Sequence, residues 1–250
     1  MFIEKPSVLT LIVVFTIFAS CGQQELNNYA TKGPVAAQPR FVINQVGCLK
    51  DAKNLQPKIL IMGDSQMSRG RDCHKLEDVI GSYTASRNIK NVAKHSTKMT
   101  SHSSNGGPIP QQYIPGNWDK LIIAGGGNDL WGSNCTDKSC LKQKIAEIEA
   151  SYVEFVETNS IEYSKIIFVY PTKVSSKAPN SLKRLVSTGA GGMLKAMFVR
   201  LEKRFTGSKY VDLSDVIGVH NPRFWDKDGY HPSEAAYEKL GQKLILDGLL

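Results

Sequence analysis

The sequence has 250 residues, of which 41% are hydrophobic and 22% are charged, and its formal net charge at pH 7 is +8. It shows no repeat and no second composition zone, which excludes a repeat architecture and predicts one ordinary domain with a full core. The lysines are scattered rather than clustered, so a nucleic-acid partner is disfavoured. A solvated surface is expected, with attraction to anionic lipid headgroups or acidic glycans as the next interpretation.

A short apolar run near the N-terminus predicts export. It spans residues 8–19 after Lys5, is too short to cross a bilayer, and is typical of the h-region of a secretory signal. We therefore divide the sequence into a signal peptide (1–20), a polar, flexible tether that leads into the domain (21–55) and one folded domain (56–250).

Cys21 is the predicted lipidation site. The small residues Ala19 and Ser20 precede it directly, as in the lipobox of bacterial lipoproteins. Phe18 and Glu4 depart from the usual pattern, so an ordinary secretory signal cut nearby stays open. Lipidation would anchor the mature chain to a bacterial membrane in the cell envelope, in the periplasm or at the outer membrane, and the alternative is secretion.

Four further cysteines, an even number, suit a compartment in which disulfides persist. Cys135 and Cys140 enclose four residues of a predicted loop, which favours a local bridge. A bridge between Cys48 and Cys73 follows by elimination. A zinc site made of the four thiols is the disfavoured alternative, because short ligand spacing is missing on both sides.

The elements of the folded domain alternate between strands and helices. Continuous apolar runs, typical of parallel strands covered on both faces, predict strands over 58–62, 88–93, 120–125, 165–170 and 209–214. Helical spacing of apolar residues predicts helices over 141–158, 193–205 and 233–250. The alternation predicts an α/β fold with a mainly parallel sheet between two layers of helices.

The polar motifs fall at the carboxyl ends of the predicted strands, where parallel sheets usually place their functional residues. Ser65, in "GDS", follows the first strand, "GGGNDLW" follows the third, and "DKDGYHPSEAAY" precedes the last helix. We expect the three motifs to meet at one edge. Ser65 is then a candidate nucleophile, although a serine after a strand also serves as a helix cap.

The later two motifs supply the partners that a nucleophilic serine needs. Asn128 offers an amide donor after three glycines that allow close approach of the backbone. Asp228 and His231, three residues apart, can deliver an acid and a base on one segment. Asp226 is a rival acid with less suitable spacing, and Asp64 and Asp129 are expected to tie the turns by local hydrogen bonds.

In this order and at these separations, the motifs resemble the SGNH hydrolases, also called GDSL-like esterases and lipases. The resemblance covers about residues 58–250 and implies a flavodoxin-like five-stranded sheet in a three-layer α/β/α fold. It implies Ser65 as nucleophile, His231 as general base and Asp228 as the residue that orients the imidazole. Asn128 and the N–H of Ser65 would stabilise the oxyanion, with no metal and no organic cofactor.

One block departs from the family pattern. Where a glycine usually completes the oxyanion hole after the second strand, this chain has Ser96, whose N–H can still donate. Gly106 and Gly107 are the alternative donors. Gly127 and Trp131 are candidates for the substrate pocket, although Trp131 suits the core equally. The remaining histidines are interpreted as surface or loop residues, and His95 alone lies near enough to Ser96 to touch substrate.

The sequence therefore predicts an exported, lipid-anchored, monomeric serine esterase acting on an acyl ester substrate. O-acetyl groups on envelope glycans, short acyl esters and lipid acyl chains are the candidate substrates. The alternatives are an acyltransferase on the same scaffold and a catalytically idle lipoprotein that binds a glycan or a protein.

Overall fold

The computed structural model describes residues 56–68, 75–102 and 107–250, all within one compact unit. The predictions of the signal peptide, the tether, lipidation at Cys21 and a bridge between Cys48 and Cys73 lie outside these residues. So do His74 and Gly106.

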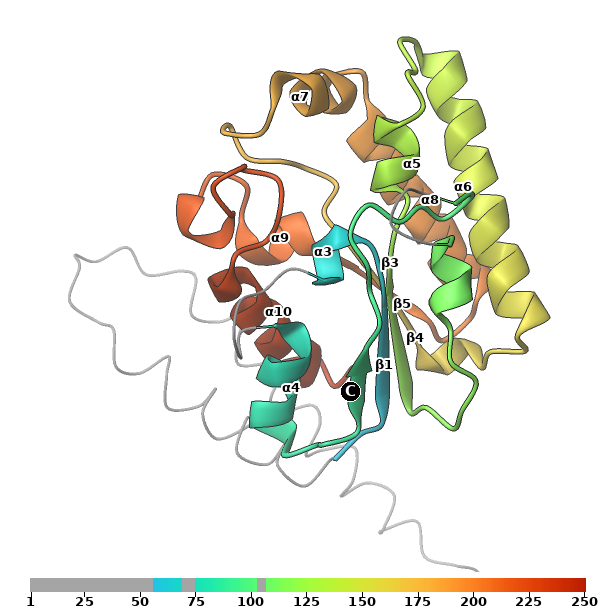
Figure 1. Ribbon diagram of the computed structural model, residues 1–250, viewed down its shortest axis with the longest axis vertical. Helices are drawn as coiled ribbons and strands as arrows, with labels where there is room; N and C mark the ends of the chain where they lie inside the picture. The colour runs from blue at the N-terminus through green and yellow to red at the C-terminus, as the bar shows by residue number, and fades with distance from the viewer. Residues whose placement is uncertain (1–55, 69–74, 103–106) are drawn as a thin grey trace, which may run out of the picture. The chain divides into compact units, whose positions relative to one another are not determined.

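A five-stranded parallel sheet forms the centre of the unit (Figure 1). Its strand order is β2-β1-β3-β4-β5, the flavodoxin-like order, so the predicted fold class is confirmed. The strands are β1 (Ile59–Gly63), β2 (Ile89–Asn91), β3 (Lys120–Ala124), β4 (Ile166–Tyr170) and β5 (Lys209–Asp212).

Helices cover both faces of the sheet. Figure 1 shows α4 and α10 on one side and α6 and α8 on the other, and each pair is in contact. The α-helices are α3 (Ser65–Ser68), α4 (Leu76–Thr84), α5 (Gly127–Trp131), α6 (Lys138–Thr158), α7 (Asn180–Ser187), α8 (Ala190–Arg204), α9 (Leu213–Ile217) and α10 (Glu234–Leu246). Short 3-10 turns are η2 (Ile109–Gln112), η3 (Tyr163–Lys165) and η4 (Pro222–Phe224).

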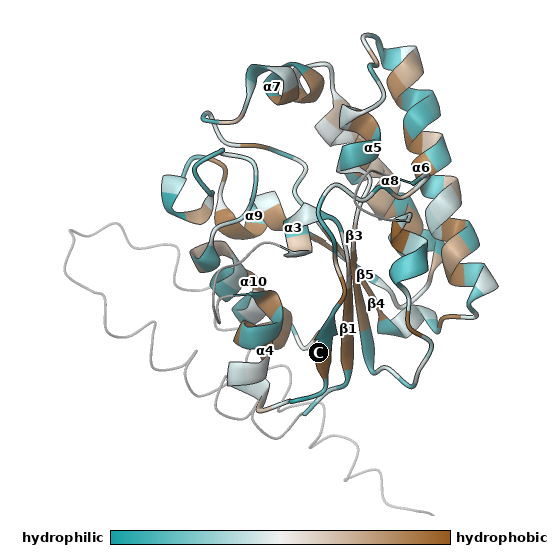
Figure 2. Cartoon of the chain, in the orientation of Figure 1, coloured by the Kyte–Doolittle hydropathy of each residue, from teal (hydrophilic) through white to brown (hydrophobic). Residues whose placement is uncertain are grey.

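The core lies between the strands and the two helical layers. Strands β1 and β4 are buried along their whole length, and Figure 2 shows the hydrophobic colour concentrated on the strands. Tyr152 of α6 packs edge-on against Phe168 of β4 and Phe198 of α8. Each large apolar side chain buried in this way contributes about 1.5–3 kcal/mol to folding, so the sheet is a rigid support for the loops at its edge.

Several element boundaries differ from the predicted ones for local reasons. Helix α6 begins at Lys138 rather than at 141, because the Asp137 carboxylate caps it by accepting from the N–H groups of Ser139 and Cys140. Strand β5 ends at Asp212, whose carboxylate caps α9. Strand β2, at the edge of the sheet, is shorter than predicted, and α4 and α7 were not predicted.

Candidate active site

The first strand ends in a turn that only glycine fits. Gly63 has φ +151°, and a Cβ there would lie 2.3 Å from the carbonyl oxygen of Ala124 on β3. The next N–H, that of Asp64, donates to the same oxygen at 3.1 Å. The chain therefore leaves β1 tightly against β3, and α3 starts immediately with Ser65, which is 6% exposed.

Ser65, His231 and Asp228 form one hydrogen-bonded series. His231 Nε2 lies 2.8 Å from Ser65 Oγ, and His231 Nδ1 lies 2.6 Å from Asp228 Oδ2. The backbone N–H groups of Tyr230 and His231 both donate to Asp228 Oδ1 at 3.0 Å. Asp228 thus holds its own turn and the imidazole at once, which is the arrangement of a serine–histidine–aspartate triad.

The environment of Asp228 keeps its carboxyl ionised. Partial burial acts to raise its pKa, but the hydrogen bonds from His231 and Tyr230 outweigh that effect and lower the pKa to about 2. The rival Asp226 has a different position, because its carboxylate accepts from the N–H of Lys227 at 2.7 Å. The carboxylate that the structure places on the imidazole is therefore that of Asp228.

Asn128 lies at the start of α5, where Gly126 at φ +105° redirects the chain after β3. Its Nδ2 donates to the carbonyl oxygen of Thr97 at 3.0 Å, which joins α5 to the loop after β2. Asp129 strengthens this junction by accepting from the N–H groups of Met99 and Thr100. The buried Asp129 is placed as expected for a carboxylate that ties turns together.

Ser96 belongs to the same loop and has φ +59°, the left-handed region that favours glycine. The backbone here therefore adopts a glycine-like conformation at the position where the family pattern expects glycine. The Ser96 side chain is exposed. A Cβ at the alternative Gly107 would lie 1.9 Å from Gln111 Oε1, the end of an exposed side chain that can move aside. The oxyanion role of Ser96 stays a prediction.

The two predicted pocket residues, Gly127 and Trp131, both lie near Tyr230, the residue before His231. A Cβ at Gly127 would lie 1.5 Å from the hydroxyl oxygen of Tyr170, so only glycine fits there. Trp131 is 42% exposed, which excludes the core interpretation, and its ring meets Tyr230 edge-on with 5.5 Å between centroids. The Tyr230 ring in turn lies 4.5 Å from that of His231.

Two polar side chains at the end of β1, those of Gln112 and Asp64, have roles that the sequence predicted only in part or not at all. Gln112 accepts from the N–H of Gly63 at 2.8 Å and donates to its carbonyl oxygen at 2.9 Å, which pins the end of β1. Asp64 is fully buried, accepts from the N–H of Gln66, and has no hydrogen-bond partner for Oδ2 among the described residues. Burial raises the pKa of Asp64 to about 7, and the charge of Asp129 adds to this rise.

His95 lies close to the helix that carries Ser65, and two of the cysteines form a disulfide. His95 is exposed, and its Nδ1 lies 3.1 Å from Ser68 Oγ on α3, one turn after the nucleophile. Cys135 and Cys140 form the predicted disulfide, which joins the segment after α5 to the first turn of α6, with a Cα–Cα distance of 5.4 Å. That bridge is confirmed.

Within the three described stretches, no group of three or more histidine, cysteine, aspartate or glutamate side chains is placed to hold a metal ion. In the same stretches, no helix combines the length and the apolar character needed to cross a membrane.

No family model matches the sequence, and no curated protein matches it. Solved structures match the fold. A lipase/acylhydrolase from Enterococcus faecalis is 16% identical, with a TM-score of 0.57 over 77% of this chain and 95% of that one. A carbohydrate acetylesterase family member from Sinorhizobium meliloti is 15% identical, with a TM-score of 0.54 over 75% and 94%.

A putative arylesterase from Agrobacterium tumefaciens is also 15% identical, with a TM-score of 0.54 over 77% of this chain and 99% of that one. At these identities the likeness establishes the fold. The chain has the α/β/α fold of these proteins, as the resemblance to the SGNH hydrolases implies.

Proposed function

We propose that this chain is an exported serine esterase that works through an acyl-enzyme. The observation that carries the proposal is the hydrogen-bonded series from Asp228 through His231 to Ser65, at the carboxyl edge of the sheet. A fold shared with proteins named as a lipase/acylhydrolase, an acetylesterase and a putative arylesterase supports it.

The proposed mechanism gives each group a role. His231 Nε2 removes the proton of Ser65 Oγ as that oxygen attacks the ester carbonyl, and Asp228 balances the charge of the imidazolium. The N–H groups of Ser65 and Ser96 and the amide of Asn128 are the proposed donors to the oxyanion. The proton then passes from His231 to the departing alcohol. A water molecule, deprotonated by the same imidazole, releases the acyl group and restores Ser65.

An O-acetyl group on an envelope glycan is the substrate we favour. The exposed ring of Trp131, two contacts away from His231 through Tyr230, offers a flat apolar face next to the triad. One of the solved structures with this fold is named as a carbohydrate acetylesterase. Short acyl esters and lipid acyl chains are the other outcomes of a substrate screen.

A fluorophosphonate probe, followed by a panel of acetylated glycans and simple acyl esters, tests the activity. We expect labelling at Ser65 and acetate release from at least one glycan. Product analysis separates hydrolysis from transfer, because a transferase would pass the acyl group to a sugar hydroxyl. Absence of both labelling and turnover would favour a binding lipoprotein over an enzyme.

The location of the protein in the cell is a separate part of the proposal. We propose that Cys21 carries a lipid and holds the protein in the cell envelope, so that Cys21→Ser shifts the protein from the membrane fraction to the soluble one. Mass spectrometry of the mature N-terminus decides the question. A free, unmodified N-terminus at another position would replace the anchor with simple secretion.

A further inference from the structure

The loop after β2 links the nucleophile helix α3 to α5, which carries Asn128. At one end of this loop, His95 Nδ1 lies 3.1 Å from Ser68 Oγ on α3. At the other end, the carbonyl oxygen of Thr97 accepts from Asn128 Nδ2 at 3.0 Å. Residues 94–98, which we call the bridging loop, therefore contact both helices of the proposed site.

The side chains of the bridging loop bring positive charge to the site. Its basic residues are Lys94, His95 and Lys98. The sequence contains no aspartate or glutamate over the 79–118 segment, in which this loop lies. Asp129 approaches the end of the loop from α5, but its two carboxylate oxygens accept hydrogen bonds from Met99 and Thr100. The loop therefore holds no negative charge of its own to balance its lysines.

The amino group of Lys98 lies at the end of α5. A Cβ at Gly132, the residue after this helix, would lie 3.0 Å from Lys98 Nζ, so the absence of a side chain makes room for the amino group. The carbonyl oxygens at this helix end already have donors, because the N–H of Gly132 donates to Asn128 and that of Ser133 donates to Leu130. Among the described residues, Lys98 Nζ forms neither a hydrogen bond nor an ion pair. Its charge is thus available to a ligand.

This amino group lies close to the proposed oxyanion donor. Gly132 follows Asn128 by four positions, and its N–H donates to the Asn128 carbonyl oxygen, so the two are about one helical turn, or about 5.4 Å, apart along the axis. Trp131, whose exposed ring meets Tyr230 beside the triad histidine, directly precedes Gly132. An ester whose carbonyl oxygen meets Asn128 therefore brings its other substituents within reach of Lys98.

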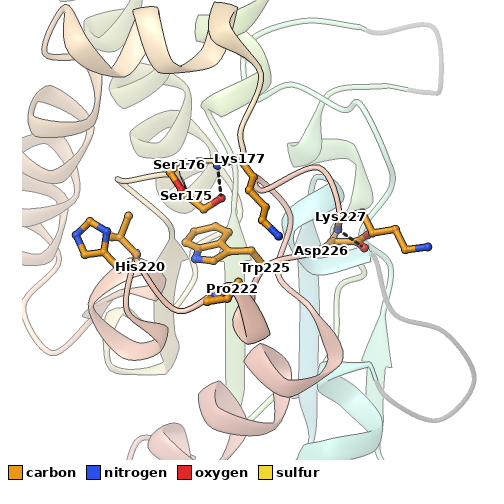
Figure 3. A pocket seen from close by; sticks show the side chains of 9 residues that line it. Ser175, Ser176, Lys177, His220, Pro222, Trp225, Asp226 and Lys227 are labelled. Atoms are coloured by element: carbon orange, nitrogen blue, oxygen red, sulfur yellow. Dashed lines mark hydrogen bonds between the residues drawn. The ribbon is translucent and has the colours of Figure 1, made fainter.

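A pocket of about 190 Å³ lies elsewhere, between the segments 175–177 and 219–227 (Figure 3). None of the described residues that line it belongs to the bridging loop or to α5. The ring of Trp225 in this pocket is 5% exposed and packs in the hydrophobic core. The cation beside Asn128 is therefore a feature of the bridging loop and not of this pocket.

We propose that Lys98 binds an anionic group, a carboxylate or a phosphate, on the alcohol part of the ester, so that the site prefers acidic esters to neutral ones. The inference rests on the proposed function, because Ser65 must act on the same ester. An acetyl group is too small to carry the charge, so the anionic group belongs to the sugar. Opposite charges attract at this partly exposed position, and binding of the anion itself requires no catalysis.

Acetate release from three matched esters tests the preference: O-acetylated galacturonate, galactose 6-phosphate and galactose. We expect a KM for at least one anionic ester that is roughly three- to tenfold lower than that for the neutral ester. The anionic ester with the lower KM distinguishes a carboxylate from a phosphate. Added salt should weaken the preference, because it screens exposed charges.

Variants of Lys98 show whether its charge causes the preference. Lys98→Gln should raise KM for the preferred anionic ester at least threefold more than for the neutral ester, and Lys98→Arg, which keeps the charge, should retain the preference. Lys120→Gln is the matched control. Lys120 is likewise a half-buried lysine, but it begins β3, at the edge of the sheet opposite the site, so this variant should behave as the native protein does.

Binding measurements separate this inference from the proposed function. Calorimetric titration of Ser65→Ala, and of Ser65→Ala combined with Lys98→Gln, with the same esters measures affinity without turnover. Selective binding of an anionic ester that the native protein does not cleave would support the role of Lys98 and refute the proposed function. Turnover without a preference for either anionic ester, or equal behaviour of Lys98→Gln and Lys120→Gln, would overturn the role of Lys98 and leave the proposed function standing.

Discussion

The Nε2 atom of His231 lies 2.8 Å from the Oγ atom of Ser65, although 166 positions separate the two residues in the sequence. Two contacts maintain this relationship from either side. The triad acid holds His231 on its Nδ1 side, and the hydroxyl of Tyr237 on α10 donates to the carbonyl oxygen of Gln66, next to Ser65, at 2.9 Å. The serine thus has a base within hydrogen-bonding distance before any substrate binds.

The first prediction concerns the nucleophile. Ser65→Ala should abolish both labelling by a serine-directed fluorophosphonate and hydrolysis of a simple acetyl ester, because Ser65 Oγ is the hydroxyl oxygen that lies 2.8 Å from His231 Nε2. Intact-mass analysis and an acetate-release assay measure the two effects. Ser68→Ala, three residues later on the same short helix, is the matched control and should still be labelled. Unchanged turnover by Ser65→Ala would end the triad assignment.

The second prediction separates the two aspartates. Asp228→Asn should lower kcat by roughly 10⁴, because an asparagine cannot hold the imidazole in the same tautomer or balance its charge. Asp226→Asn should cost much less on a neutral acetyl ester, since its carboxylate accepts from the N–H of Lys227. Steady-state kinetics of the two variants decide between them. A larger loss for Asp226→Asn would transfer the acid role to that residue.

The third prediction concerns the oxyanion donors. Asn128→Ala should lower kcat by about 10²–10³, the usual loss for one such donor. Ser96→Gly should keep kcat within about threefold, because glycine preserves the N–H and accepts φ +59° without strain. Ser96→Val should have a free energy of unfolding about 1–2 kcal/mol lower than that of Ser96→Gly, since a residue with a Cβ is strained in the left-handed region. If Ser96→Gly were as damaging as Asn128→Ala, the serine hydroxyl would itself take part.

The fourth prediction uses the pKa of Asp64, which is about 7 in the folded protein and 3.8 in its ordinary state. The folded state therefore retains a proton that the unfolded state loses. The stability from this group is complete below pH 4 and is lost as the pH rises through 7. Asp64→Asn should remove that dependence. The difference in free energy of unfolding between this variant and the native protein should therefore shift in favour of the variant, by up to about 1.4 kcal/mol for each pH unit between pH 4 and 7.

Urea unfolding at pH 4.5, 6.0 and 7.5 measures the effect. Asparagine can still accept from the N–H of Gln66, so the turn is preserved. The low pKa of Asp228 acts in a separate window, because its contribution is lost only as the pH falls towards 2. Parallel stability curves for the two proteins would show that burial does not perturb Asp64.

The sequence predicted those parts of the fold that depend on local pattern. The apolar runs around Leu60, Ile122 and Phe168 are long and continuous, so their strands were placed to within one or two residues. Strand β2 is half exposed and has only three residues, which gives a weaker signal. Helix α7 buries only Leu182, so it carries too short an apolar stripe to be recognised.

The site could be predicted wherever chemistry and spacing coincide, as they do for Asp228 and His231. Gln112 could not be predicted, because its role depends on the approach of η2 to the end of β1, and nothing in "IPQQY" signals that contact. Burial of Asp64 likewise follows from packing rather than from its neighbours in the chain.

The positions of the triad residues in the sequence determine when the site can form during synthesis. Synthesis delivers Ser65 early, whereas its base comes near the C-terminus and depends on α10, which packs against α4 and reaches Gln66. A chain still emerging from the ribosome, or crossing a membrane, holds the serine without the imidazole. An ester-cleaving centre would therefore form only when the chain is complete and folded.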